Sequence, residues 1–162
     1  MRIAMCSDEP YPVHEVVRAL LEKRGHTVVG FGSIATGNEA AWADVAEQAA
    51  LSIARGECDE GVFFCWSGTG ISMAANKVAG IRAALCGDPG TARAARIWNH
   101  ANVLCLSNRT LSTDIAKEII EAWFEPASGG EGDEGVRKLE AVERRQLARR
   151  QRDRGQRTPA AD

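Results

Sequence analysis

Short apolar runs alternate with amphipathic stretches along most of the chain. Five runs have the length and residue types of buried β-strands, namely 2–7, 27–31, 61–66, 81–86 and 102–106. The stretches between or after them repeat apolar residues at helical spacing, namely 12–24, 40–55, 70–78, 89–98 and 112–124. Alternating strands and helices form parallel sheets with right-handed crossovers. We therefore predict a three-layer α/β/α sandwich around a five-stranded, mainly parallel, Rossmann-like sheet.

The domain organisation follows from where this pattern stops. We predict that residues 1–125 form one α/β domain, because a chain of 162 residues has the length of a single domain. A run rich in glycine and acidic residues at 126–135 predicts a flexible loop. Residues 136–151 have helical composition but a narrow apolar stripe, which is typical of a helix that rests on another subunit or on the domain flank. Residues 152–162 are expected to be disordered.

Charge and composition argue against nucleic-acid or membrane partners. The formal net charge is −2, the hydrophobic content is 44%, and no apolar stretch reaches membrane-spanning length. Nine Lys/Arg against three Asp/Glu lie in 137–157. Because no aromatic residues are interleaved with these basic residues, a solvated helix face is the favoured interpretation over a nucleic-acid surface.

The cysteines and histidines refine the picture. The five cysteines contain no C-x-x-C pair, which predicts free thiols in a reducing, cytoplasmic setting. Cys6, Cys86 and Cys105 end or lie within apolar runs and are interpreted as inert core thiols. His14 and His26 fall on helix and loop surface by pattern, and we treat both as structural.

The strongest chemical signal lies in residues 61–77. An apolar strand that ends at Cys65 stops at a small turn, Ser67-Gly68-Thr69-Gly70, and helical spacing begins directly afterwards. Such a strand, turn and helix present bare backbone N–H groups at a positive helix end, where an anionic oxygen binds well. A thiol beside a helix start can become a reactive thiolate. The segment predicts a thiol base or nucleophile beside a pocket for negative charge.

Three kinds of enzyme could use this arrangement. A dinucleotide fold needs G-x-G-x-x-G after the first strand, but here the turn follows the third strand and Met73 occupies the third glycine position. A thiol phosphatase needs an arginine shortly after the cysteine, and the first basic residue here is Lys77. An aldose–ketose isomerase needs a base and backbone donors for an enediolate oxygen, which the segment offers.

Residues 70–84, Gly-Ile-Ser-Met-Ala-Ala-Asn-Lys-Val-Ala-Gly-Ile-Arg-Ala-Ala, carry a family resemblance. With Cys65 and Asn102-Val103-Leu104, they resemble type B ribose-5-phosphate isomerases and the related galactose-6-phosphate isomerase subunits. The resemblance covers most of 1–125. It implies a cytoplasmic enzyme of carbohydrate metabolism and the pentose phosphate pathway, with ribose 5-phosphate and ribulose 5-phosphate as default substrates. It also implies a homodimer or tetramer with interfacial active sites and no metal or organic cofactor.

The resemblance assigns roles near the glycine turn. Cys65 matches the cysteine that abstracts the C2 proton, because the alternative glutamate position holds Ile71. Ser67 matches a hydroxyl residue that assists ring opening or proton shuttling, and Asp8 matches a carboxylate that contacts sugar hydroxyls. The turn residues Gly68, Thr69 and Gly70 match the backbone cradle for the enediolate.

Several positions depart from the family pattern. Glu9 stands where histidine is usual, and Trp66 stands where glycine is usual. Trp98 aligns with the ring-opening histidine, and His100 is the nearest imidazole. Two C-terminal phosphate-binding arginines align with Glu134 and Lys138. The expected substrate-binding residues are Glu9, Trp66, Gly68, Thr69, Gly70, Trp98, Asn99, His100, Arg109, Arg137 and Lys138.

These departures leave the substrate open. Replacing arginine by glutamate in a phosphate site removes bidentate contacts and adds repulsion. Another phosphosugar, or a less charged sugar, is therefore an alternative to ribose 5-phosphate. A second alternative is a catalytically weakened protein that binds sugar phosphates.

Overall fold

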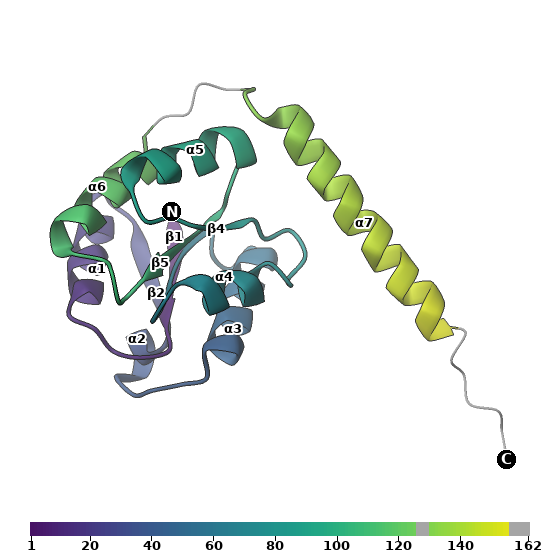
Figure 1. The fold of residues 1–162 in the computed structure, drawn as a ribbon. Helices are drawn as coiled ribbons and strands as arrows, with labels where there is room; N and C mark the ends of the chain where they lie inside the picture. The colour runs from purple at the N-terminus through teal and green to yellow at the C-terminus, as the bar shows by residue number, and fades with distance from the viewer. Residues whose placement is uncertain (126–129, 156–162) are drawn as a thin grey trace, which may run out of the picture.

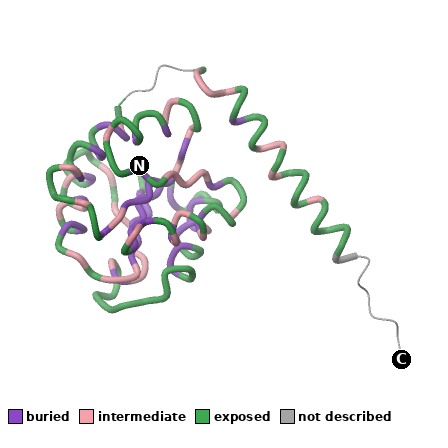
Figure 2. Tube along the Cα trace, in the orientation of Figure 1, coloured by how far each residue is buried: buried purple, intermediate pink, exposed green. Residues whose placement is uncertain are grey.

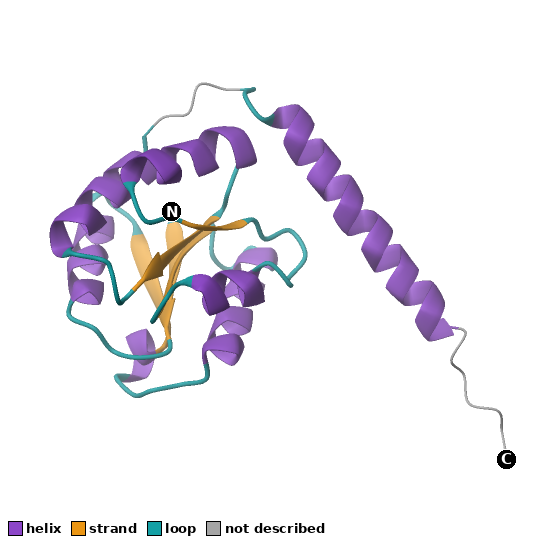
Figure 3. Cartoon of the chain, viewed as in Figure 1, coloured by secondary structure: helices purple, strands orange, loops and turns teal. Residues whose placement is uncertain are grey.

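Parallel strands and covering helices form three layers in the computed structural model, which describes residues 1–125 and 130–155 (Figure 1, Figure 3). The five strands pair in parallel in the order β2-β1-β3-β5-β4, which confirms the predicted α/β sandwich. The strands are β1 Arg2–Ser7, β2 Thr27–Gly32, β3 Glu60–Cys65, β4 Ala83–Leu85 and β5 Val103–Ser107. The helices are α1 Val13–Lys23, α2 Ser33–Thr36, α3 Trp42–Ala54, α4 Thr69–Ala75, α5 Pro89–Asn99, α6 Thr113–Trp123 and α7 Asp133–Gly155.

Each face of the sheet carries its own apolar cluster, because side chains alternate along a strand. Met5 and Phe64 lie on the face covered by α1, α5 and α6. Cys6 and Phe63 lie on the opposite face, which α3 and α4 cover. The central strands are thus buried on both sides, and Figure 2 shows this buried centre in purple. Burial on both faces explains why the sequences of these strands are continuous apolar runs.

Two details differ from the sequence prediction. The short helix α2 was not predicted, because four residues are too few for helical periodicity to register. Strand β4 has three residues within the predicted range 81–86. Two asparagine side chains accept hydrogen bonds from backbone N–H groups at the start of this strand. Asn102 Oδ1 accepts from Arg82 N at 2.8 Å, and Asn76 Oδ1 accepts from Ala83 N at 2.8 Å.

Helix α7 projects away from the sandwich (Figure 1), and its Glu143 carboxylate accepts from Gly80 N at 3.1 Å. It begins at Asp133, inside the predicted loop, and reaches Gly155, inside the predicted tail. Acidic residues in its first turn favour that start. The remaining parts of those two predictions, 126–129 and 156–162, lie outside the described residues. Across 1–125 and 130–155, every helix lacks the length or the hydropathy that a membrane crossing requires.

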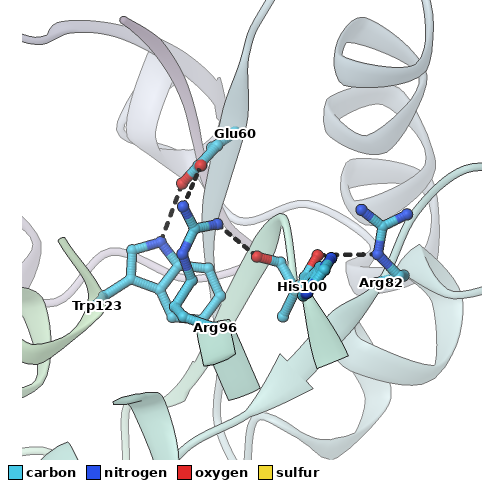
Figure 4. Close-up of polar contacts among 6 residues, drawn as sticks. Glu60, Arg82, Arg96, His100 and Trp123 are labelled. Atoms are coloured by element: carbon cyan, nitrogen blue, oxygen red, sulfur yellow. Dashed lines mark hydrogen bonds and ion pairs between the residues drawn. The ribbon is translucent and has the colours of Figure 1, made fainter. Parts of the chain in front are cut away.

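A polar cluster fixes the end of α5 at the amino edge of the sheet (Figure 4). The carboxylate of Glu60, at the start of β3, binds Arg96 Nη2 at 2.7 Å and accepts from Trp123 Nε1 at 3.1 Å. The Arg96 guanidinium also lies 5.0 Å from the Trp123 ring centroid. Beyond α5, His100 adopts a φ of +45°, and its carbonyl accepts from Arg82 Nε at 2.8 Å. These contacts set where α5 ends and β5 begins.

Candidate active site

The carboxyl ends of β1, β3 and β5 meet at one edge of the sheet. Ser7 pairs with Phe64, and Cys65 pairs with Ser107. Beyond the strand ends the pairing continues, since Asn108 N donates to the Cys65 carbonyl at 3.0 Å and Arg109 N donates to the Trp66 carbonyl at 3.0 Å. The register therefore gathers the segments that carry the predicted catalytic residues.

Cys65 is the cysteine at this edge. It is the last residue of β3, its neighbour Trp66 is 53% exposed, and Cys65 itself is 5% exposed. Cys6 and Cys105 are fully buried, and burial raises the pKa of each thiol well above its usual value. Burial also raises the pKa of the Cys86 thiol to about 12. Those three cysteines are core residues with raised thiol pKa values; Cys65 also belongs to the apolar cluster beneath α3 and α4, but it borders the glycine turn.

The turn after Cys65 depends on Gly68. Gly68 has a φ of +75°, caps α4, and donates its N–H to the Cys65 carbonyl at 3.2 Å. A Cβ on Gly68 would lie 2.4 Å from Leu85 Cδ1 and 3.1 Å from Leu106 backbone atoms. Ser67 Oγ and Thr69 Oγ1 lie 2.7 Å apart, which orients the two hydroxyls. The first amides of a helix have no intrahelical acceptor, so this turn offers donors beside the sulfur.

Asp8 and Glu9 follow β1 at the same edge. Partial burial raises the pKa of Asp8 from its usual value, and its Oδ1 accepts from Glu9 N at 3.0 Å. Glu9 Oε2 accepts from the Tyr11 hydroxyl at 3.0 Å, and this bond raises the pKa of Tyr11. The loop therefore presents one carboxyl group whose pKa is raised by partial burial and one that is oriented by a phenol.

Trp66 and Arg109 form a stacked pair next to Cys65. The Arg109 guanidinium carbon lies 5.1 Å from the centroid of the Trp66 ring. Ser107 Oγ donates to the Trp66 carbonyl at 3.0 Å, and Arg109 N donates to the same oxygen. A guanidinium that lies over an indole face can still direct N–H groups at an anion.

Trp98, Asn99 and His100 lie at the other end of the sheet. They end α5 or follow it, just before β5, where Gly61 N donates to the Asn102 carbonyl. Gly61 and Cys65 are four residues apart along β3, a separation of about 13 Å. His100 Nε2 lies 2.8 Å from the Glu131 carbonyl and 3.5 Å from Asp133 Oδ1, so the imidazole supports the start of α7. Within one chain these residues do not join the Cys65 group.

Arg137 and Lys138 lie on α7, also away from Cys65. Both are exposed, and Lys138 Nζ pairs with the Glu134 carboxylate. A cavity of about 1060 Å³ separates α7 from β4 and α5, and Cys65 does not line it. The apolar side chains of α7 that line this cavity are Leu139, Val142 and Leu147, each exposed by 42–51%.

The prediction that His14 lies at the surface was wrong. His14 is 3% exposed and packs against Phe64 with ring centroids 4.6 Å apart. His26 is half-buried beside Phe124. Within the ranges 1–125 and 130–155, no group of three or more His, Cys, Asp or Glu side chains could hold a metal ion.

Known proteins similar to this chain cover most of its length. The sequence model of the family described as Ribose/Galactose Isomerase matches residues 3–142. Ribose-5-phosphate isomerase B of Escherichia coli K12 is 39% identical over 133 residues, 82% of this chain and 88% of that protein. D-erythrulose-4-phosphate isomerase of Pectobacterium atrosepticum is 39% identical over 112 residues, 69% of this chain and 74% of that protein. The solved ribose-5-phosphate isomerase B of Clostridium thermocellum has a TM-score of 0.82 at 36% identity and covers 90% of this chain and 99% of its own.

The glycine turn can be tested by substitution. We expect Gly68→Ala to lower the free energy of unfolding by at least about 1–2 kcal/mol, because an alanine is strained at this positive φ. The clash with Leu85 adds to that cost. Gly87→Ala is the matched control, since a Cβ there meets no atom within 4 Å. Urea unfolding measures both, and equal stabilities of the two variants would contradict the assigned role of Gly68.

Proposed function

Because the chain belongs to the ribose/galactose isomerase family and is a sugar-phosphate isomerase, we propose that the Cys65 thiolate is its catalytic base. The default substrates are ribose 5-phosphate and ribulose 5-phosphate, by similarity to the ribose-5-phosphate isomerases B of Escherichia coli and Clostridium thermocellum. The position of Cys65 carries the proposal. Cys65 ends β3 directly before the glycine turn, between the loop that carries Asp8 and the loop that carries Arg109.

The proposed reaction is a proton transfer between adjacent carbons. The Cys65 thiolate removes the C2 proton of the open-chain aldose, and the electron pair moves through the new C1–C2 double bond onto the C1 oxygen. Amides of Gly68–Gly70 stabilise the resulting enediolate oxygen. Cys65 then returns its proton to C1, and Ser67 or Asp8 carries the hydroxyl proton from O2 to O1. Atoms and charge balance, and the product is the ketose.

The carboxyl groups of Asp8 and Glu9, in the loop after β1, are suited to the proton transfers of this reaction. Partial burial raises the pKa of Asp8, so this carboxyl group takes up a proton at higher pH than a fully solvated aspartate does. Glu9, oriented by Tyr11, takes the place of a histidine and is proposed as the group that assists ring opening or contacts a further hydroxyl.

The active site is proposed to be shared between two copies of the chain. Trp98, Asn99 and His100 sit at the amino edge of the sheet, so they reach a Cys65 only if it belongs to a partner subunit. Arg137 and Lys138 lie on α7, which projects from the sandwich, so they are proposed to reach a partner subunit in the same way. A two-fold dimer brings such opposite ends together twice, once in each site.

The occupant proposed for the gap beside α7 is therefore a second copy of the chain. β4 is the edge strand of the sheet, and Leu85 on it is 40% exposed. Facing this edge across the cavity, α7 exposes Leu139, Val142 and Leu147. An unpaired strand edge and an apolar helix face are surfaces that association covers.

A four-carbon phosphosugar is the second candidate substrate. Trp66 fills space where glycine is usual, and its ring holds the Arg109 guanidinium beside Cys65. An anion bound by Arg109 would then lie near the reacting carbons, which suits a shorter substrate. The D-erythrulose-4-phosphate isomerase of Pectobacterium atrosepticum, at 39% identity, agrees with this candidate.

Removal of the base is the direct test of the chemistry. We expect Cys65→Ala to lower kcat by about 10²–10⁴-fold, the usual contribution of a positioned base. Cys86→Ala should retain activity, because that thiol is a core residue outside the site. Turnover is measured as ketose formed from aldose phosphate. Undiminished turnover in folded Cys65→Ala would overturn the mechanism.

A mixing experiment tests the shared site. Cys65→Ala and the double variant Arg137→Ala/Lys138→Ala should each be nearly inactive, but a refolded equimolar mixture should recover about a quarter of wild-type activity. Recovery occurs because half of the dimers carry one complete site. Size-exclusion chromatography with light scattering gives the oligomeric state. Failure of the mixture to recover activity, or a monomer at working concentration, would contradict the proposal.

A panel of aldose phosphates tests how many carbons the preferred substrate has. Wild type should convert a four-carbon aldose phosphate with higher kcat/KM than ribose 5-phosphate, if the Trp66–Arg109 pair sets the length. Trp66→Gly should shift that ratio toward ribose 5-phosphate by about tenfold, whereas Trp66→Phe, which keeps a ring, should shift it less. An unchanged ratio in Trp66→Gly rejects the four-carbon candidate. Thermal stabilisation by these ligands without turnover would instead mark a sugar-phosphate-binding protein.

A further inference from the structure

A buried chain of polar groups runs beneath the candidate site. His14 is 3% exposed and its Nε2 lies 2.8 Å from Asn108 Oδ1. Asn108 is 8% exposed, and its Nδ2 donates to Ser7 Oγ at 3.3 Å. Ser7, fully buried, donates its hydroxyl to the Glu9 carbonyl at 2.8 Å. These partners satisfy the polar side-chain atoms of His14, Asn108 and Ser7 in a region where an unsatisfied group would be costly.

The chain of bonds defines the protonation state of His14. Tyr11 N–H donates to His14 Nδ1 at 3.3 Å, so Nδ1 carries a lone pair. The single proton of the neutral ring therefore lies on Nε2 and is donated to Asn108 Oδ1. The donors run in one direction, from Tyr11 N–H through His14, Asn108 and Ser7 to the Glu9 carbonyl. A second proton, on Nδ1, would face the Tyr11 N–H and break that direction.

This chain of bonds connects all three loops of the site. Tyr11 and Glu9, whose side chains also pair through the Tyr11 hydroxyl, stand at its two ends, and both belong to the loop after β1. Asn108 lies in the middle of this chain, its own N–H donates to the Cys65 carbonyl, and it precedes Arg109 in the sequence. His14, on the first turn of α1, is thus the bridge between the loop after β1 and the loop after β5.

From this geometry we propose that His14, in its neutral Nε2–H form, is a positioning residue for the isomerase reaction. It holds the Asp8–Glu9 loop against the Asn108–Arg109 loop and so sets both relative to Cys65. It does not touch the substrate. The proposal rests on the isomerase function proposed above, because that function gives these loops their roles.

The surroundings of His14 favour the neutral ring. Burial is the largest effect on its pKa, which is lowered from the usual value, although the Asn108 bond and Glu15 act in the opposite direction. Glu15, on the same helix, is the charged group that acts on the ring. Tyr11 and Phe64 pack against the imidazole with centroid distances of 5.9 and 4.6 Å, and Phe64 and Asn108 carry no charge.

Three substitutions separate positioning from packing. His14→Phe keeps an aromatic ring on Phe64 but removes both polar contacts. His14→Gln retains a donor toward Asn108. His14→Asn retains only an acceptor toward Tyr11. We expect kcat/KM to fall about tenfold or more in His14→Phe, because small displacements of reacting groups are costly, and to be largely restored in His14→Gln. Assays run below the melting temperature of each variant, with wild type and Cys65→Ala in parallel.

Hydrogen exchange gives a readout that needs no substrate. The amides of Asp8, Glu9, Tyr11, Asn108 and Arg109 should exchange faster in His14→Phe and return toward wild-type rates in His14→Gln. Wild-type exchange in folded His14→Phe overturns the positioning role, whether or not the protein turns over sugars. Inactive wild type with the expected exchange pattern would instead reject the isomerase function while retaining the bridge.

A pH profile completes the test. Asn108→Asp places a carboxylate on Nε2, which favours the imidazolium, so the loss of kcat/KM from His14 protonation should begin at higher pH than in wild type. In Asn108→Asp/His14→Gln, position 14 cannot titrate and the shift should disappear. Asn108→Asp and the double variant carry the same new carboxylate, so its direct effect on the neighbouring groups is common to both. Identical profiles for Asn108→Asp and the double variant would contradict the proposal.

Discussion

Two backbone hydrogen bonds past the ends of β3 and β5 hold the reactive edge together. They join the Cys65 carbonyl to Asn108 N and the Trp66 carbonyl to Arg109 N. Because they extend the β3–β5 ladder, the thiol and the guanidinium share the register of the sheet rather than depending on loop conformation. A slip of one residue would turn Cys65 to the opposite face. The chemistry of the site thus depends on the same pairing that builds the core.

The sequence was sufficient where the determining interactions are short-range. Apolar runs located all five strands, and the glycine turn marked the place where β3 gives way to α4. The sequence analysis assigned Asp8, Cys65 and Arg109 by resemblance, and they converge in the structure because the carboxyl ends of parallel strands share an edge. The turn could be recognised from the sequence because Gly68 has a positive φ, a backbone conformation that favours glycine.

The features that the sequence did not reveal depend on distant partners. His14 looked like a surface histidine, since its partner Asn108 is 94 positions away and no local pattern links them. The segment Trp98–His100 was grouped with Cys65 by resemblance, but the path of α5 carries it to the other edge of the sheet. The start of α7 was placed too late, because glycines before Asp133 resemble a loop while the acidic first turn favours a helix.

The segment that leads into α7 packs closely against the end of α5. Gly132, at a φ of +83°, packs so closely that a Cβ would lie 2.3 Å from the Trp98 carbonyl oxygen, and the His100 ring lies against Glu131 from the other side. The helix of 23 residues extends about 35 Å from that point. A rotation of only about 10° at its base would sweep the far tip through about 6 Å. Gly132 at the base and the contact between the Glu143 carboxylate and Gly80 N farther along therefore both constrain the direction of the C-terminal helix.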